Sequence, residues 1–162
     1  MTPQDQIGHR GEALFAVMVT RQCEGRAWFF EVMLGEKYPT VDFHVDLLKP
    51  SIEKAYCFVQ VKATNQGYLG TGVTRKLNVK ITKSDVLKLR KVPAPTYIVG
   101  IDTTKPMGQG FIMAIDRSVT KGINGLPTKY PFDCRALKKL WAEVDDYWKA
   151  RNMLMAKSVF SI

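Results

Sequence analysis

An aspartate, a glutamine and a lysine stand at spacings that could bring them together on two neighbouring strands. Asp42 is near the start of the segment 41–48, and Gln60 and Lys62 are at the end of the segment 55–62. Because side chains alternate along a strand, Gln60 and Lys62 point to the same face. If the two strands pair as a hairpin, Asp42 lies near Lys62. An acid, an amide oxygen and an ammonium would then surround one point.

These three groups suit the hydrolysis of a phosphodiester bond. Carboxylate and carbonyl oxygens are ligands for a hard cation such as Mg²⁺. The cation polarises the phosphate and activates water, and a positive side chain steadies the attacking or leaving oxygen. The backbone carbonyl of Val61 could supply a further ligand.

The surrounding sequence predicts one α/β domain that positions this pair of strands. The segment 96–101 is apolar on both faces, which is typical of a central strand. Leu137, Leu140 and Leu154 belong to the apolar face of a final helix. The expected elements are, in order, a helix at about 4–24, strands at 27–34, 41–48 and 55–62 that form a meander, a helix capped by Thr82 or Ser84 and ending at Lys91, strands at 96–101 and 111–115, and a helix beginning near Asp133.

Composition bounds the class of protein. With 162 residues, 46% of them hydrophobic, the chain is long enough for one buried core and too short for two ordinary domains. Its apolar runs are too short for a membrane span, and its first residues are polar, so we expect a soluble, cytoplasmic protein. Cys23, Cys57 and Cys134 are odd in number and far apart, which predicts neither a disulfide framework nor a zinc site, and we expect all three to be reduced.

Positive charge is concentrated just after the strand that carries Lys62. The net charge is +9, and residues 62–101 hold eight basic side chains and one acidic side chain. Between 76 and 81, apolar residues alternate with Lys76, Asn78 and Lys80, so that one face of this segment is cationic. A solvated helix face is the default interpretation, but the position favours contacts with nucleic-acid phosphates. The residues expected to make them are Arg75, Lys76, Lys80 and Lys83.

At these residues the sequence resembles the PD-(D/E)XK, or restriction endonuclease-like, nuclease superfamily. The resemblance extends from residue 8 to about residue 116. It is closest to the branch in which glutamine replaces the acid of the last motif, and to an uncharacterised bacterial family with a Gly-x-x-Gly-Glu opening helix and a Gln-Val-Lys strand. Here residues 8–12 and 60–62 match those two motifs. Two positions depart from the pattern, since Val41 replaces the usual proline and Thr40 a frequent glycine.

The resemblance implies a central mixed sheet flanked by helices and a metal-dependent nuclease acting on DNA. Glu12 and Asp42 would be acidic ligands of Mg²⁺, or of Mn²⁺ as a substitute, and Gln60 a weaker ligand. Lys62 would be the catalytic cation. A homodimer or a partner from a defence system is compatible with this class.

Several alternatives stay open. Asp42 alone could simply cap a turn, and Glu12 lies far enough from the centre of its helix's apolar face to point to solvent. Asp46 is the alternate acid, and His44, on the same strand face, could activate water or help to bind a second metal. The neutral Gln60 favours a second function, a catalytically inactive nuclease-fold module that binds nucleic acid or a protein. An accessory or immunity subunit of a larger system is a third.

Overall fold

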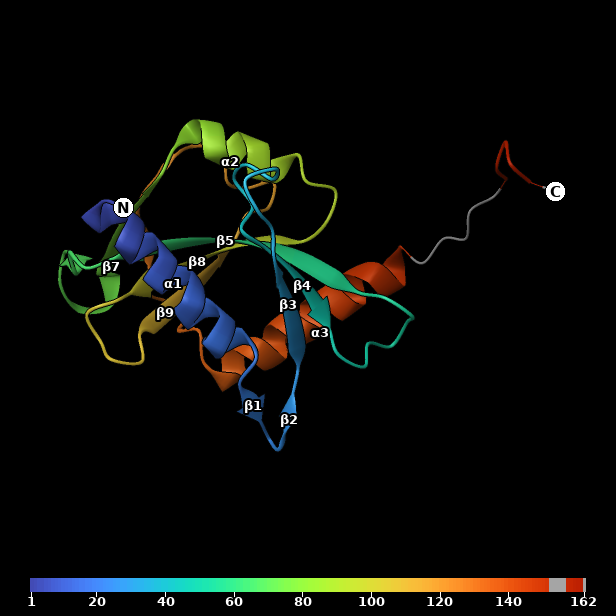
Figure 1. Ribbon diagram of the computed structural model, residues 1–162, viewed down its shortest axis with the longest axis horizontal. Helices are drawn as coiled ribbons and strands as arrows, with labels where there is room; N and C mark the ends of the chain where they lie inside the picture. The colour runs from blue at the N-terminus through green and yellow to red at the C-terminus, as the bar shows by residue number, and fades with distance from the viewer. Residues whose placement is uncertain (152–156, 162) are drawn as a thin grey trace.

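The computed structural model describes residues 1–151 and 157–161 and is a mixed α/β fold (Figure 1). The predicted position Leu154 lies outside the described residues. In chain order the elements are α1 (Pro3–Val19), β1 (Gln22–Cys23), β2 (Arg26–Ala27), β3 (Phe29–Met33), β4 (Phe43–Leu47), β5 (Tyr56–Thr64), β6 (Tyr68–Leu69), the 3₁₀ turn η1 (Gly72–Thr74), β7 (Lys76–Ile81), α2 (Lys83–Arg90), β8 (Thr96–Asp102), β9 (Gln109–Ala114), β10 (Ile123–Pro127) and α3 (Cys134–Ala150).

The main sheet has five strands in the order β3-β4-β5-β8-β9. β3, β4 and β5 form the predicted antiparallel meander, β5 and β8 are parallel, and β9 is antiparallel to β8. All seven residues of β8 are buried, as its doubly apolar sequence predicts. A parallel pair needs a long crossover connection, and the chain from β6 to α2 supplies it. The predicted mixed sheet is therefore confirmed.

Helices cover the two faces of this sheet. Phe15 of α1 and Leu137 of α3 share one core cluster with Val59 of β5. Leu89 of α2 packs in a second cluster with Ile98 of β8. In Figure 1, α2 accordingly lies above β5, whereas α1 and α3 lie below it.

The predicted helix starts agree with the caps. Thr82, one of two predicted candidates, accepts a hydrogen bond from Asp85 N–H at the start of α2, and Asp133 accepts one from Ala136 N–H at the start of α3. The opening helix is shorter than predicted: it ends at Val19, because the chain then turns into the β1–β2 hairpin.

The predicted element order omitted a second sheet, with strand order β10-β7-β6. β7 has the alternation expected for residues 76–81, with Leu77, Val79 and Ile81 buried. The sheet lies directly on β8 at Gly100, where a Cβ would come within 2.6 Å of Leu126 Cδ2 and 2.9 Å of Leu77 Cδ2. β6 is only two residues long, and β10 pairs with β7 across α2, β8 and β9, so the alternation of residues 76–81 alone did not reveal the sheet.

The expectation that all three cysteines are reduced is wrong. Cys23 and Cys134 form a disulfide that ties the β1–β2 hairpin to the start of α3, and Cys57 is a buried free thiol. The two partners are 111 residues apart in sequence, so spacing could not reveal the pair. Within the described residues, no helix combines the length and apolar character needed to cross a membrane.

Candidate active site

Asp42 lies between two strands and is held by both. It immediately precedes β4, and its backbone N–H donates to Val59 O at 3.0 Å while its carbonyl accepts from Leu34 N–H at 2.8 Å. Its carboxylate Oδ2 accepts a hydrogen bond from the Val61 N–H at 2.6 Å. The side chain therefore bonds across to β5 rather than capping the turn that precedes it, so the turn-cap interpretation is not the one found.

The turn before Asp42 is strained. Thr40 has φ of +80°, a region that side chains with a branched Cβ rarely adopt. Val41 N–H bonds Tyr38 O at 3.3 Å and closes the turn. Such backbone conformations persist only where the surrounding structure enforces them, and here the enforcement directs Asp42 onto β5.

The electrostatics of Asp42 connect it to two other predicted residues. Burial raises the pKa of its carboxyl to about 6; the bond from Val61 opposes this, the charge of Glu12 raises the pKa further, and that of Lys62 lowers it. Glu12 and Lys62 are thus both close enough to act on Asp42. The Asp42 carboxyl is therefore the group through which Glu12 and Lys62 are linked electrostatically.

A glycine lets the helix that carries Glu12 lie close to β5. Gly11, its neighbour on α1, is buried, and a Cβ there would lie 2.4 Å from Ala63 Cβ and 3.7 Å from Val61 Cγ1. Gly8 has no atom within 4 Å of such a Cβ. Gly11 is therefore the glycine that lets α1 lie against β5.

Gln60 supplies an unsatisfied oxygen. The residue is 5% exposed, and its Oε1 is buried without a hydrogen-bond partner among the residues that the structure describes. A buried amide oxygen without a partner costs folding free energy, so its retention suits an atom that takes a ligand. By strand alternation Gln60 and Lys62 share the face opposite to Val61.

The donor types suit a hard cation, but the donors come from two sides of β5. The helix that carries Glu12 packs on the Val61 and Ala63 side, and Gln60 lies on the opposite face. Glu12 and Asp42 offer carboxylate oxygens and Gln60 an amide oxygen, the ligand types that Mg²⁺ and Mn²⁺ take. Across the described ranges, there is no cluster of three or more His, Cys, Asp or Glu side chains placed to hold a metal. That is expected of a site with two acids, in which the third ligand is a glutamine.

Asp46, the alternate acid, belongs to a different part of the strand. It is paired with Tyr56, and four residues of strand, about 13 Å, separate it from Asp42. Asp46 Oδ2 is 3.7 Å from His44 Nδ1, and its buried Oδ1 has no partner within the described part of the chain. The His44 ring stacks on Tyr56 with centroids 4.9 Å apart. His44 and Asp46 form a separate pair beside the Asp42 group.

The predicted phosphate-binding residues lie on the second sheet and the start of α2. Lys76, Lys80 and Lys83 are exposed, and Arg75 is half-buried with its guanidinium 4.4 Å from the Tyr68 ring centroid. Within the described ranges none of these four forms an ion pair. Their charges are therefore available to an anionic partner.

Sequence reasoning missed one polar group next to this site. Asp102, 1% exposed, ends β8 in register with Thr64, two residues beyond Lys62. Its Oδ1 accepts from Thr104, and its Oδ2 accepts from the Tyr68 hydroxyl at 3.0 Å. Both oxygens are satisfied, so Asp102 fixes the end of the strand; the one signal in the sequence was an acid directly after an apolar run.

Comparison with models of protein families, with curated proteins and with solved structures finds no match to this chain. The class that the coordinates define is a mixed α/β domain with a buried polar group on its central strands.

Proposed function

We propose that the chain is a magnesium-dependent nuclease that hydrolyses phosphodiester bonds in DNA. The observation that supports this most is the 2.6 Å hydrogen bond from Val61 N–H to Asp42 Oδ2, which holds a carboxylate beside Gln60 and Lys62. The charge of Glu12 acts on the same carboxylate. The same proposal treats the meander and the parallel β5–β8 pair as a restriction endonuclease-like core.

The residues have distinct parts in this proposal. Glu12, Asp42 and Gln60 would hold the cation, with the Val61 carbonyl as a further ligand. When bound, the cation polarises the phosphate and lowers the pKa of water so that it can attack. Lys62, half-buried on the strand face of Gln60, places its ammonium against negative charge that develops on the reacting phosphate.

Partial burial should let the charge of Lys62 stabilise the reacting phosphate more strongly than an exposed lysine would. Charge interactions strengthen where water is partly excluded, as around the half-buried Lys62. Lys76, Lys80 and Lys83, which are exposed, would instead hold the DNA backbone through contacts that carry no base specificity.

The experiment incubates the purified protein with supercoiled, linear, branched and single-stranded DNA, with Mg²⁺ or with EDTA. We expect Mg²⁺-dependent cleavage of at least one form, reduced at least about 100-fold in Lys62→Ala. Lys54→Ala is the matched control, since it removes an exposed lysine just before the same strand, and it should cut normally. Cleavage that persists in EDTA or in Lys62→Ala rejects the proposal.

One observation favours a second candidate, a catalytically inactive module that binds nucleic acid or a protein. Gln60 is neutral, so only two carboxylates are available to hold a cation. Titration with Mn²⁺ separates the two candidates. An active site should bind Mn²⁺ at least about tenfold more tightly in the wild type than in Asp42→Ala, whereas an inactive module should show no difference.

A further inference from the structure

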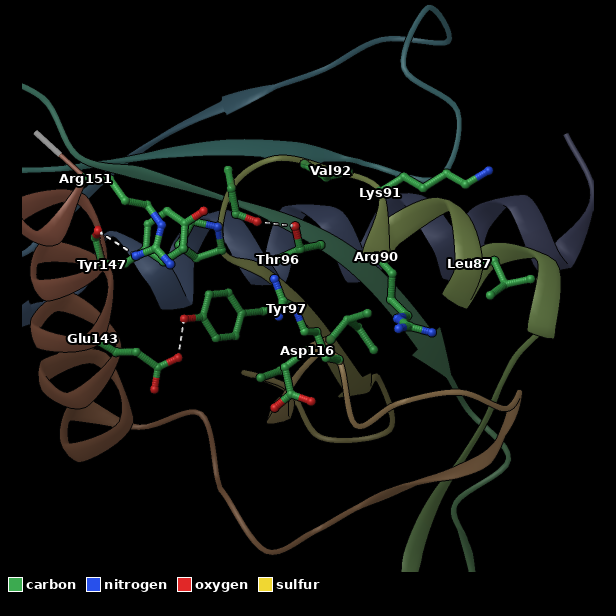
Figure 2. Close-up of a pocket in the computed structure, with 15 residues that line it drawn as sticks. Leu87, Arg90, Lys91, Val92, Thr96, Tyr97, Asp116, Glu143, Tyr147 and Arg151 are labelled. Carbon is green, nitrogen blue, oxygen red and sulfur yellow. Dashed lines mark hydrogen bonds between the residues drawn. The ribbon is translucent and has the colours of Figure 1, made fainter. Parts of the chain in front are cut away.

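A cavity of about 790 Å³ lies away from the Asp42 group, at the end of the sheet where β8 begins. Its walls are the last turn of α2, the first residues of β8, the chain after β9, and α3. In Figure 2, Glu143, Tyr147 and Arg151 line it on the left, Arg90 on the right, and Tyr97 lies between them. Its volume is in the range of sites for small organic ligands.

Basic side chains dominate its polar lining. Arg90, Arg117 and Arg151 come from three separate parts of the chain, and within the described residues none of them forms an ion pair. Figure 2 shows Arg90 extending toward Asp116, whereas Lys91 extends away from Tyr97. Basic side chains outnumber acidic ones around the cavity, since Arg90, Lys91, Arg117 and Arg151 face only Asp116 and Glu143. An excess of guanidinium groups suits an anion with several oxygens.

The two acids of the cavity already have partners. Asp116 accepts hydrogen bonds from Ser118 N–H at 2.8 Å and from the Ser118 hydroxyl at 2.5 Å. Glu143 Oε1 accepts from the Tyr97 hydroxyl at 2.5 Å. The hydrogen bonds from Ser118 and the charge of Arg90 both lower the pKa of the Asp116 carboxyl. Arg117 and Arg151 form no ion pair with either acid within the described part of the chain.

An aromatic platform stands on the α3 side. The Arg151 guanidinium lies 3.7 Å from the centroid of the Tyr147 ring, and Arg151 Nη1 donates to Tyr147 O at 3.1 Å. Nucleobases stack on tyrosine rings and on guanidinium planes. Apart from Lys91 and Thr96, the remaining lining is apolar, which suits a base and a sugar. It comes from α2, the α2–β8 connection, the end of β9 and the residue after it: Leu87, Val92, Ala94, Pro95, Ala114 and Ile115.

We infer that this cavity binds a phosphorylated nucleoside, with its base beside Tyr147 and Arg151 and its phosphates at Arg90 and Arg117. The same chemistry has two sources, a free nucleotide and the 5′-phosphorylated end of a nucleic acid. This site does not depend on the proposed nuclease activity, because its lining includes none of the residues assigned to that activity.

Isothermal titration in EDTA with ADP, adenosine, pyrophosphate and short oligonucleotides with a 5′-phosphate or a 5′-hydroxyl tests this inference. EDTA removes any contribution of a metal at the Asp42 group. We expect ADP or the 5′-phosphorylated oligonucleotide to bind at least about tenfold more tightly than adenosine and than pyrophosphate, since both halves of the ligand make contacts. Binding by ADP alone identifies a free nucleotide, and binding by the phosphorylated oligonucleotide alone identifies an end.

Matched variants localise the binding. The double variant Arg90→Gln/Arg117→Gln should weaken it at least about tenfold, whereas Lys88→Gln/Lys121→Gln, with the same charge change on the same two segments outside the cavity, should change it by less than about twofold. Tyr147→Leu should weaken it, and Tyr147→Phe, which keeps the ring, should restore it. The inference is overturned if no phosphorylated probe binds, if pyrophosphate binds as tightly as ADP, or if the double arginine variant binds normally.

Discussion

The Asp42 carboxylate accepts a hydrogen bond from the backbone N–H of Val61 at 2.6 Å. Val61 lies between Gln60 and Lys62 on β5, so this bond places the carboxylate next to the segment 60–62. One hydrogen bond thereby fixes an acid on the loop before β4 relative to Gln60 and Lys62. It also leaves the buried carboxyl with a pKa of about 6, because burial outweighs the stabilising bond.

Replacing Asp42 should stabilise the metal-free protein. Its pKa is raised by burial from 3.8 to about 6, so folding favours the protonated form; that contribution is complete below about pH 3.8 and is lost as the pH rises through about 6. Asp42→Asn keeps the shape and an oxygen for Val61 N–H. In EDTA at about pH 8 we expect ~1 to 2 kcal/mol of added stability, discounted from a ceiling of ~3 kcal/mol for partial exposure.

Urea unfolding at about pH 4.5 and about pH 8 measures this effect, which should shrink at the lower pH. Asp146→Asn, at an exposed position of α3, is the control and should change stability little at either pH. A variant that is less stable than the wild type at the higher pH would show that burial does not destabilise the Asp42 carboxylate.

Two glycines of α1 should respond oppositely to alanine. Gly8→Ala meets no atom within 4 Å and gains helix propensity, so we expect ~0.5 to 1 kcal/mol of stabilisation. Gly11→Ala would place a Cβ 2.4 Å from Ala63 Cβ, so it should destabilise by ~1 to 3 kcal/mol and displace Glu12. Urea unfolding of the two variants checks both signs. Equal effects would argue against close packing of α1 on β5.

Thiol titration tests the disulfide. The denatured, unreduced chain should expose one thiol, from Cys57, and three after reduction. Cys23→Ala/Cys134→Ala should lower the free energy of unfolding by ~2 to 4 kcal/mol, because the bond closes a long loop. Three thiols before reduction would mean that the bond does not form in the purified protein.

The exposed lysines of β7 and α2 should contribute to DNA affinity without selecting sequence. Lys80→Gln/Lys83→Gln should weaken binding of unrelated duplexes equally and reduce the salt dependence of the affinity by about two phosphate contacts. Fluorescence anisotropy in EDTA at several salt concentrations measures this. Lys129→Gln/Lys139→Gln removes two exposed lysines elsewhere as the control, and equal losses in both pairs would refute a defined DNA path.

Local sequence patterns were sufficient to predict most of the main sheet. The meander, the buried strand β8 and the caps of α2 and α3 follow from alternation and from residues such as Thr82 and Asp133, which act within a few positions of themselves. The position of Asp42 beside β5 could be predicted for a related reason. In an antiparallel hairpin, the spacing of two residues along the chain determines whether they lie opposite each other, and β4 and β5 form such a pair.

Features that depend on contacts between distant segments could not be predicted from the sequence. The disulfide joins residues 111 positions apart, and the second sheet pairs β7 with β10 across α2, β8 and β9. The strained φ of Thr40 and the close approach at Gly11 could not be predicted either, because a residue type alone does not reveal its φ or its spatial neighbour.

The initial rate of DNA cleavage by Asp42→Asn, with Mg²⁺ at about pH 8, tests the central claim most directly. We expect a protein that is more stable than the wild type and yet cuts at least about 100-fold more slowly, because the same carboxylate that destabilises the metal-free fold would hold the cation. A folded Asp42→Asn protein that cuts as fast as the wild type would contradict it.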